Sequence, residues 1–323
     1  MSTISSAVVQ DHLTREGYIG LPDLFDPKAA KDLLDAVLSI RRFDSSLFLS
    51  EAEWDASPKT HKNTNPGPGF NVLEKFPEKL DFVEKNPSFQ AVLNGLLGPQ
   101  YRILTKKLVC RLSWNKVPGW LQQRVRGTPC NTFGAYMHPQ YRDITYFLDN
   151  DLHQDVQDFA RMPVATRDHR YITLYVYLDE VTENDAPVHL LPATHILGAT
   201  PFQHDINYNA DKDSWIYTGP SAEAVESKML RLTGAGGYAG LWHSCIIHGA
   251  PPVKEGHLRI SLRYLIGRDP DATACGLDDI NWHIRGPLHL EEDFTPGSRA
   301  TYDGLWNLRM TDFIRMGYAN ANL

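Results

Sequence analysis

Residues Gly236–Ile266, GGYAGLWHSCIIHGAPPVKEGHLRISLRYLI, contain the pattern around which the rest of the chain is organised. Two apolar runs, Leu241–Ile247 and Leu258–Ile266, flank the segment Ala250–Gly256, which is rich in proline and glycine. Short β-branched and aromatic runs on either side of such a turn predict an antiparallel pair of β-strands. We therefore expect these two runs to pair with each other.

The second run has two chemically different faces. Because side chains alternate across a strand, Arg259, Ser261 and Arg263 share one face. The opposite face is apolar and consists of Leu258, Ile260, Leu262 and Tyr264. A cationic stripe backed by an apolar face predicts the polar lining of a barrel whose outer face is covered by other elements.

A candidate metal site combines the first run with an upstream segment, His153-Gln154-Asp155. In an extended segment residues i and i+2 point the same way, so the imidazole of His153 and the carboxylate of Asp155 converge. His248 completes a set of two histidines and one carboxylate, which suits Fe(II) and leaves coordination positions open for a cosubstrate and oxygen. His243 falls on the opposite face from His248, so we do not expect these two histidines to serve one ion.

Four motifs follow one another in chain order: His153-x-Asp155, a central segment from Glu183 to His195, His248-Gly249, and Arg259-x-Ser261. Together they resemble the phytanoyl-CoA dioxygenase family of Fe(II)/2-oxoglutarate oxygenases. Arg259 lies eleven residues after His248, the separation that this family uses between its distal histidine and its oxoglutarate-binding arginine. The chain departs from the family pattern at positions that include no metal ligand: Leu152, Asp185, Ala193, Thr194 and Val253.

The resemblance implies a mainly β fold with flanking helices, a double-stranded β-helix of the jelly-roll or cupin-like kind. It implies that Fe(II) is held by His153, Asp155 and His248, which are the catalytic residues. The cosubstrate 2-oxoglutarate would be held by Arg259, whose planar fork matches a carboxylate, together with Ser261. Thr173, on the predicted strand Tyr171–Leu178, is a further candidate for the cosubstrate site.

The family uses O2 and 2-oxoglutarate to oxidise a C–H bond, and it releases succinate and CO2. The expected outcome is hydroxylation, with desaturation, ring formation or demethylation as variants. Halogenases of this type replace the carboxylate ligand with a small residue, so the presence of Asp155 argues against halogenation.

Aromatic and cationic residues gather in the segment Trp114–Asn150, just before the metal motif. Candidate substrate contacts are Trp120, Arg124, Arg126, Tyr136 and, from the cationic stripe, Arg263. Such residues at the mouth of a barrel would bind a small polar or anionic molecule, such as an amino-acid-like compound or a secondary metabolite. Two alternatives stay open: the aromatic residues cover the core, and Arg263 pairs with an acid or supports Arg259. The lid would be either this segment or the loop Ser45–Pro77.

Composition limits the class of protein. With 323 residues, of which 42% are hydrophobic, the chain can bury one sizeable core as a single domain. We expect a helical part over about residues 1–100, a barrel core over about 101–270 and a C-terminal extension over about 271–323. A net charge of −7 argues against a nucleic-acid partner.

Several signals point to a cytoplasmic enzyme without a membrane partner. The start, MSTISSAVVQDH, lacks the basic and apolar regions of a signal peptide, and no stretch is apolar enough to span a bilayer. The 4 cysteines have no CxxC spacing and are expected to be reduced thiols.

Two other functions are compatible with parts of this pattern. A cupin-type metal enzyme that does not use 2-oxoglutarate would keep the metal set but would have no use for Arg259-x-Ser261. A non-catalytic binding protein of the same fold would be expected to have a damaged metal set, whereas this one is intact.

Local patterns predict the other elements. Helices are expected at Val8–Glu16, Pro27 to about Arg42, Ser88–Leu97 and Thr301–Met316, and strands at Arg102–Leu112 and Tyr171–Leu178. Asn207–Ser227 is polar, which predicts an exposed loop with a short helix.

Overall fold

The computed structural model describes residues 4–57, 66, 69–125, 133–147, 150–156, 170–200, 204–219 and 221–288. Within this part of the chain a larger sheet has the strand order β1-β11-β5-β13-β2-β3, and a smaller sheet has the order β10-β6-β12-β4. The strands of the larger sheet are β1 (Tyr18–Leu21), β11 (Ala239–His243), β5 (Tyr171–Tyr177), β13 (Leu258–Gly267), β2 (Arg102–Leu112) and β3 (Thr145–Phe147). Those of the smaller sheet are β10 (Leu230–Leu232), β6 (Val188–Leu191), β12 (Ile247–Ala250) and β4 (Asn150–His153).

The two sheets pack face to face. One buried cluster joins both inner faces, with Val109, Tyr175 and Tyr177 from the larger sheet and Val188 and Leu190 from the smaller. Neighbouring strands are antiparallel except for β2 and β3. This arrangement is the expected double-stranded β-helix of the jelly-roll kind.

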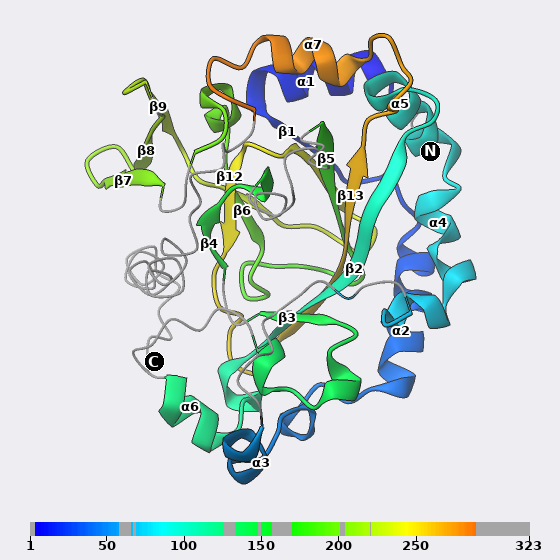
Figure 1. Ribbon diagram of the computed structural model, residues 1–323, viewed down its shortest axis with the longest axis vertical. Coiled ribbons are helices and arrows are strands. Elements are labelled where there is room, and N and C mark those ends of the chain that lie inside the picture. The colour runs from blue at the N-terminus through cyan, green and yellow to red at the C-terminus, as the bar shows by residue number, and fades with distance from the viewer. Residues whose placement is uncertain are drawn as a thin grey trace.

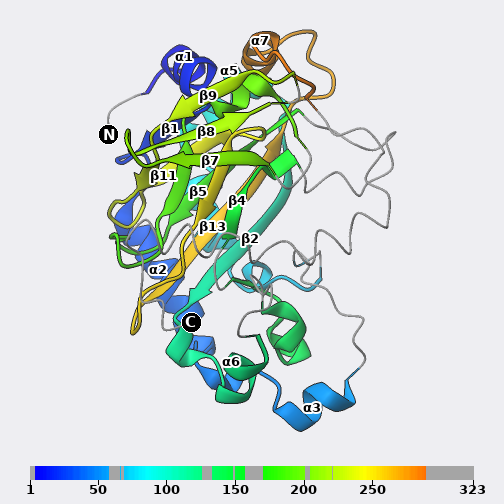
Figure 2. The same cartoon turned by 90° about the vertical axis from the view of Figure 1, so that its left-hand side faces the viewer.

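Helices cover the outside of the larger sheet and the ends of the molecule. They are α1 (Ser6–Glu16), α2 (Pro27–Ile40), α3 (Glu51–Ala56), α4 (Asp81–Glu84), α5 (Pro87–Leu97), α6 (Gly119–Val125) and α7 (Gly276–Trp282). In Figures 1 and 2, α1, α5 and α7 lie at one end and α3 and α6 at the other, and in Figure 1 α2 and α4 flank the larger sheet. The short 3-10 helices are Ser45–Leu47, Val72–Lys75, Pro77–Leu80, Trp114–Lys116, Gly134–Tyr136, Pro139–Tyr141 and Thr194–Leu197.

Alternation along the strands separates the main core from the inner face, as the sequence predicts. The β13 residues Ile260, Leu262 and Tyr264 are buried in the main core cluster with residues of α1, α2 and α5. The alternate residues of β13, with those of β5, point to the opposite side. The helix α2 begins as predicted, with Pro27 in its first turn and the Asp26 carboxylate accepting a hydrogen bond from the backbone N–H of Lys28.

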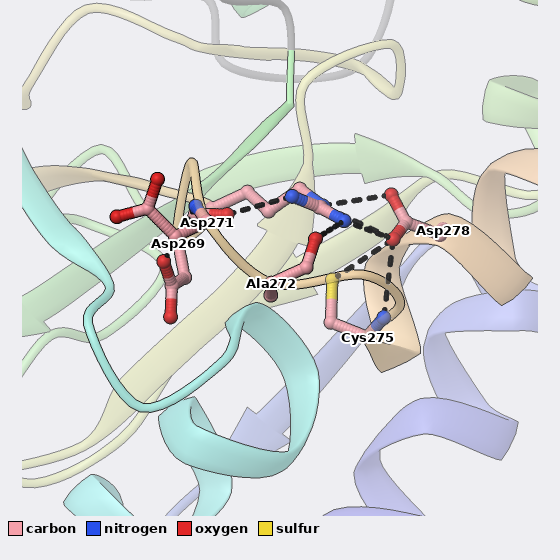
Figure 3. Close-up of polar contacts among 6 residues, drawn as sticks. Asp269, Asp271, Ala272, Cys275 and Asp278 are labelled. Atoms are coloured by element: carbon pink, nitrogen blue, oxygen red, sulfur yellow. Dashed lines mark hydrogen bonds and ion pairs between the residues drawn. The ribbon is translucent and has the colours of Figure 1, made fainter.

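A buried arginine attaches α7 to the end of β13. Arg268 donates from Nε and Nη2 to the carboxylate of Asp278, at 2.9 and 2.7 Å, and from Nη1 and Nη2 to the carbonyls of Asp269 and Ala272. Asp278 also accepts from the backbone N–H of Cys275. Figure 3 shows one group of contacts at the Asp278 carboxylate and another at the carbonyls of Asp269 and Ala272. The first turn of α7 is thereby held to the larger sheet.

The predicted pairing of the two apolar runs is wrong. The strand β13 pairs with β2 and β5, and the run Leu241–Ile247 contains the end of β11 and the start of β12, which belong to different sheets. The backbone turns between them, where the N–H of Ile246 donates to the carbonyl of His243. The segment Pro251–His257 therefore crosses between sheets, and apolar runs around a turn do not reveal which strand each will join.

The prediction for Asn207–Ser227 is also wrong. This region forms a third, antiparallel sheet of β7 (Asp205–Asn209), β8 (Ser214–Thr218) and β9 (Ala224–Ser227). The sheet is stabilised because Ile206, Trp215 and Tyr217 bury against Leu152 and Ile247 of the smaller sheet. The many polar residues of these strands hid the strand pattern in the sequence.

Some predicted features lie outside the described residues. They include the helix Thr301–Met316, Arg126, Cys130 and part of the loop Ser45–Pro77. In the described part, Cys110, Cys245 and Cys275 are free thiols. None of the described helices combines the length and the apolar character needed to cross a membrane.

Candidate metal centre

Two histidines face each other across neighbouring strands of the smaller sheet. His153 on β4 and His248 on β12 are direct partners in the register, and their ring centroids are 4.3 Å apart. Nδ1 of His248 lies 3.1 Å from the carbonyl oxygen of Ile246, so this nitrogen carries the proton and donates it. In the neutral tautomer that donates from Nδ1, Nε2 is free to bind a metal ion.

Asp155 follows β4 and brings a carboxylate to the same place. Its Oδ1 lies 3.5 Å from Nε2 of His248 and 4.0 Å from Nε2 of His153. The three ligand atoms lie within 4.8 Å of one another, and among the described residues these side chains form the group that could hold a metal ion. The donor set of two imidazoles and one carboxylate suits Fe(II).

The carboxylate of Asp155 is fixed by donors from the larger sheet. Its Oδ2 accepts a hydrogen bond from the hydroxyl of Thr173 on β5 at 2.5 Å and one from Nε1 of Trp242 on β11 at 3.1 Å. Arg263 on β13 donates to Oδ1. The imidazoles thus come from one sheet, and the groups that orient the carboxylate come from the other.

Between the two candidate ligands of the HxD motif, Gln154 points the opposite way and anchors the backbone. Its Nε2 donates to the carbonyls of Cys245 and Gly198 at 2.7 and 2.8 Å, and its Oε1 accepts from the N–H of Thr200 at 2.9 Å. The hydrogen bonds of Gln154 therefore fix the backbone between the two candidate ligands.

Burial and charge act in opposite directions on Asp155, which is 2% exposed. Burial alone would raise the pKa of its carboxyl group, but the Arg263 guanidinium and the His248 imidazole hold that pKa well below its ordinary value. The carboxylate is therefore ionised and available as a ligand at neutral pH.

Arg259 and Ser261 lie on the inner face of β13. Arg259 is 2% exposed and donates to the carbonyl of Ala186 and, at 3.3 Å, to the hydroxyl of Tyr175. Nε of Arg259 and Oγ of Ser261 are buried and have no hydrogen-bond partner among the described residues. A carboxylate supplies acceptors for both groups, so these residues fit 2-oxoglutarate.

Two aromatic rings connect Arg259 with the candidate metal ligands. The guanidinium lies 5.5 Å from the ring of Tyr175, which stacks on Trp242 with a centroid separation of 5.8 Å. Trp242 in turn lies 5.2 Å from the ring of His248. The cosubstrate candidates and the candidate metal ligands thus belong to one continuous buried region.

The residues predicted to contact substrate fall into two places. Arg124 stacks over Trp120 and forms ion pairs with Glu51 and Asp55 of α3, at 3.4 and 3.1 Å. Tyr136 packs against Trp120 and Trp54 in the same cluster. Figures 1 and 2 show α3 and α6 at one end of the molecule, away from β4. The structure therefore groups these residues with α3, whereas Arg263 contacts Asp155.

Sequence reasoning did not assign Thr173 and Trp242 as donors to Asp155, and it left the pairing of Arg263 with an acid open without naming that acid. Thr173 was expected at the cosubstrate, and Trp242 had no assigned role. The hydroxyl of Tyr171 also donates to the backbone carbonyl of Asp155 at 2.6 Å. The polar face of β5 was the available signal, but its partner could be identified only once the two sheets were placed together.

Comparison with known proteins gives one family and several distant structures. The sequence profile of the family described as Phytanoyl-CoA dioxygenase (PhyH) matches residues 13–261. A search of curated protein sequences gives no match.

Solved structures with a similar fold have low sequence identity. The epimerase SnoN in complex with Fe3+, alpha ketoglutarate and nogalamycin RO is 13% identical, with 81% of this chain and 83% of that chain covered and a TM-score of 0.46. The carbocyclase SnoK from nogalamycin biosynthesis is 12% identical, with coverages of 83% and 87% and a TM-score of 0.46. EctD from S. alaskensis in its apoform is 14% identical, with coverages of 83% and 79% and a TM-score of 0.45.

The matched residues include most of the chain and both halves of the site, from the HxD motif to Ser261. The protein therefore belongs to the phytanoyl-CoA dioxygenase family and is a 2-oxoglutarate-dependent non-haem iron oxygenase.

Proposed function

We propose that the protein hydroxylates an unactivated C–H bond of a small polar molecule while 2-oxoglutarate is converted to succinate and CO2. The observation that carries this proposal is the position of Arg259 and Ser261 in the same buried region as the group His153, Asp155 and His248. A metal enzyme that does not use 2-oxoglutarate would have no need for a buried arginine and serine with free donor capacity.

Each of these side chains has a separate role in the proposal. His153, Asp155 and His248 hold Fe(II), and the bound iron supplies the chemistry that activates O2 for oxidation of the substrate. Arg259 binds the distal carboxylate of 2-oxoglutarate through its remaining N–H groups, and Ser261 donates its hydroxyl to the same carboxylate. Tyr175 orients the guanidinium of Arg259 through the hydrogen bond to its hydroxyl.

The inner face of the larger sheet supports a polar substrate. Lys107 and Arg111 of β2 lie directly opposite Arg263 and Arg259 in the register, and cross-strand partners share a face. All four side chains are buried. Arg259 is assigned to 2-oxoglutarate and Arg263 contacts Asp155, so the positive charge of Lys107 and Arg111 is what favours a molecule with an acidic group, such as an amino-acid-like compound or a secondary metabolite with a carboxylate.

The proposal is tested by following succinate formation with Fe(II), O2 and 2-oxoglutarate in the presence of candidate substrates, with mass spectrometry to detect the gain of one oxygen atom in the product. We expect His153→Ala to abolish substrate-dependent succinate formation, because it removes one of three metal ligands. His283→Ala is the matched control, since this histidine lies exposed at the end of α7 and should keep full activity.

A complementary measurement does not need the substrate. Anaerobic addition of Fe(II) and 2-oxoglutarate should give a weak visible charge-transfer band that His153→Ala lacks. Absence of the band in folded parent protein, or equal succinate formation by His153→Ala and the parent, would contradict the proposed function.

A further inference from the structure

Arg263 contacts the oxygen atom that a metal ion would need. It is largely buried on β13, and its Nη2 donates to Oδ1 of Asp155. The same Oδ1 is the atom closest to Nε2 of both His153 and His248. The guanidinium and a metal ion would therefore compete for one carboxylate oxygen.

The other oxygen of Asp155 cannot take over this interaction. Oδ2 already accepts hydrogen bonds from Thr173 at 2.5 Å and from Trp242 at 3.1 Å. Both donors are held by strands of the larger sheet, so the carboxylate cannot rotate without breaking them. Arg263 and the metal are thus restricted to the same side of the same group.

The distances indicate how the competition would proceed. Two atoms that coordinate one ion at roughly 2.1 Å and at a right angle lie roughly 3 Å apart. Oδ1 of Asp155 is 3.5 Å from Nε2 of His248 and 4.0 Å from Nε2 of His153. Bringing the three ligand atoms around an ion draws Oδ1 toward the imidazoles and away from Arg263.

Electrostatics favour the same exchange. A carboxylate buried like that of Asp155 is costly without a counter-ion, and Arg263 supplies that positive charge. A divalent ion at the site would neutralise the carboxylate and would repel the neighbouring guanidinium. The chain therefore needs Arg263 most when no metal is bound.

We propose that Arg263 is the counter-ion of Asp155 in the metal-free protein and is displaced from Oδ1 when the metal ion binds. This inference rests on the metal site of the proposed function and adds a residue that tunes its affinity. Arg263 stabilises the folded protein before metal is bound, and it weakens metal binding by competing for a ligand atom.

The test compares metal binding by the full chain and by Arg263→Met in the absence of 2-oxoglutarate, with Mn(II) in air and Fe(II) under anaerobic conditions. We expect Arg263→Met to bind the metal about tenfold more tightly, because a charge-assisted competitor is gone. Without metal the variant should melt at a lower temperature than the parent, and metal should raise its melting temperature by more.

Arg259→Met is the matched control for this experiment. Arg259 is a buried arginine on the same face of the same strand, but its described contacts are the carbonyl of Ala186 and the hydroxyl of Tyr175. Its substitution should change metal affinity much less than Arg263→Met does. If both variants changed metal affinity equally, the effect would come from the loss of a buried positive charge in general, and the specific role of Arg263 would be refuted.

Other outcomes separate this inference from the metal-site assignment. Unchanged or weaker metal binding by Arg263→Met would overturn the inference. If Asp155→Ala bound metal as the parent does, the metal site itself would be wrong. If Asp155→Ala lost the metal while Arg263→Met bound it as the parent does, only the role of Arg263 would fail.

A second variant keeps the test decisive if Arg263→Met does not fold without metal. Arg263→Lys retains the charge but loses the planar fork, so we expect metal binding about threefold tighter than in the parent. Metal binding by Arg263→Lys that is equal to or weaker than that of the parent would then contradict the inference.

Discussion

The indole N–H of Trp242 donates a hydrogen bond to Oδ2 of Asp155 at 3.1 Å. This bond joins β11 of the larger sheet to a candidate metal ligand that follows β4 of the smaller sheet. Trp242→Phe would keep the aromatic packing against His248 and Tyr175 but remove the donor. We expect metal affinity to fall about tenfold, since partners that orient a ligand typically contribute that much. Titration with Mn(II) measures the change, and unaltered affinity would show that the indole does not orient the carboxylate.

Thr173 offers a sharper comparison because its hydroxyl can be removed or retained. Thr173→Val removes the donor at nearly constant shape and should lower metal affinity about tenfold without 2-oxoglutarate present. Thr173→Ser keeps the hydroxyl and should bind metal almost as the parent does. If both variants bound metal normally but Thr173→Val required more 2-oxoglutarate, the hydroxyl would serve the cosubstrate, as the sequence analysis suggests.

Arg259 is predicted to determine the requirement for 2-oxoglutarate. Replacing it with alanine removes a charge-assisted contact of about 1.5–3 kcal/mol, which corresponds to an increase of about 10-fold to 150-fold in the KM for 2-oxoglutarate. Arg259→Lys should recover little, because a lysine does not reproduce the planar fork. Succinate formation as a function of 2-oxoglutarate concentration measures both effects, and an unchanged KM in Arg259→Ala would refute this assignment.

Two buried histidines should make stability depend on pH. Burial lowers the pKa of His195 to about 3 and that of His243 to about 4, from an ordinary value of 6.5. Below pH 6.5 these two histidines are protonated in the unfolded chain but stay neutral in the folded chain. The folded state therefore has its full stability above pH 6.5 and loses it as the pH falls to about 4 for His243 and to about 3 for His195. Each histidine should reduce the free energy of unfolding by about 1.4 kcal/mol per pH unit inside this window.

Urea denaturation at several pH values measures this loss. His243 has defined neutral hydrogen bonds, since its Nδ1 accepts from the N–H of Cys245 and its Nε2 donates to Asn281. His243→Gln should therefore reduce the pH dependence by about one proton. A pH dependence identical to that of the parent would mean that this histidine binds its proton equally well in the folded and the unfolded protein.

The contacts that attach α7 to the end of β13 should contribute substantially to the free energy of unfolding. Arg268 is buried and its Nε and Nη2 bind Asp278 (Figure 3 shows the surrounding contacts). Arg268→Met removes a donor from the partly exposed Asp278 carboxylate and from two carbonyls, and it should lower the free energy of unfolding by about 1.5–3 kcal/mol. Arg285→Met is the control, because its ion pair with Glu223 is exposed and should contribute less than about 1 kcal/mol.

Patterns within single strands predicted a large part of this architecture. The alternation along β13 identified its inner face, because the two-residue period of side chains along a strand is a local property of the chain. The ordered motifs likewise selected the three side chains that the structure brings together as a possible metal site. These predictions needed only the direction of side chains relative to their own backbone.

Predictions that required a partner strand were less successful. The runs before and after Ala250–Gly256 were expected to pair with each other, but β12 joins β4 and β6 while β13 joins β2 and β5. Strand pairing depends on which apolar faces can be buried together, and that is a property of the whole fold. The sequence left open that Arg263 pairs with an acid, but it did not identify that acid as Asp155, which is 108 residues away in the chain.

The aromatic and basic segment before the metal motif shows a further limit. Its composition suggested a substrate site, whereas Arg124 is engaged by Glu51 and Asp55 and its neighbours pack on α3. Opposite charges that lie far apart in the sequence can satisfy such a cation as well as a ligand can. Composition alone does not distinguish these two uses.

Asp155 lies at the boundary between the two sheets. Its backbone follows β4 of the smaller sheet, and its carboxylate accepts hydrogen bonds from three residues of the larger sheet, Thr173, Trp242 and Arg263. An ion bound between this carboxylate and the imidazoles of β4 and β12 would have all its protein ligands on the smaller sheet, and Thr173 and Trp242 would still connect the carboxylate to the larger sheet. Release of Arg263 would remove one of these three donor contacts between the sheets, so metal binding would change the packing of the two sheets around Asp155 as well as the ligands themselves.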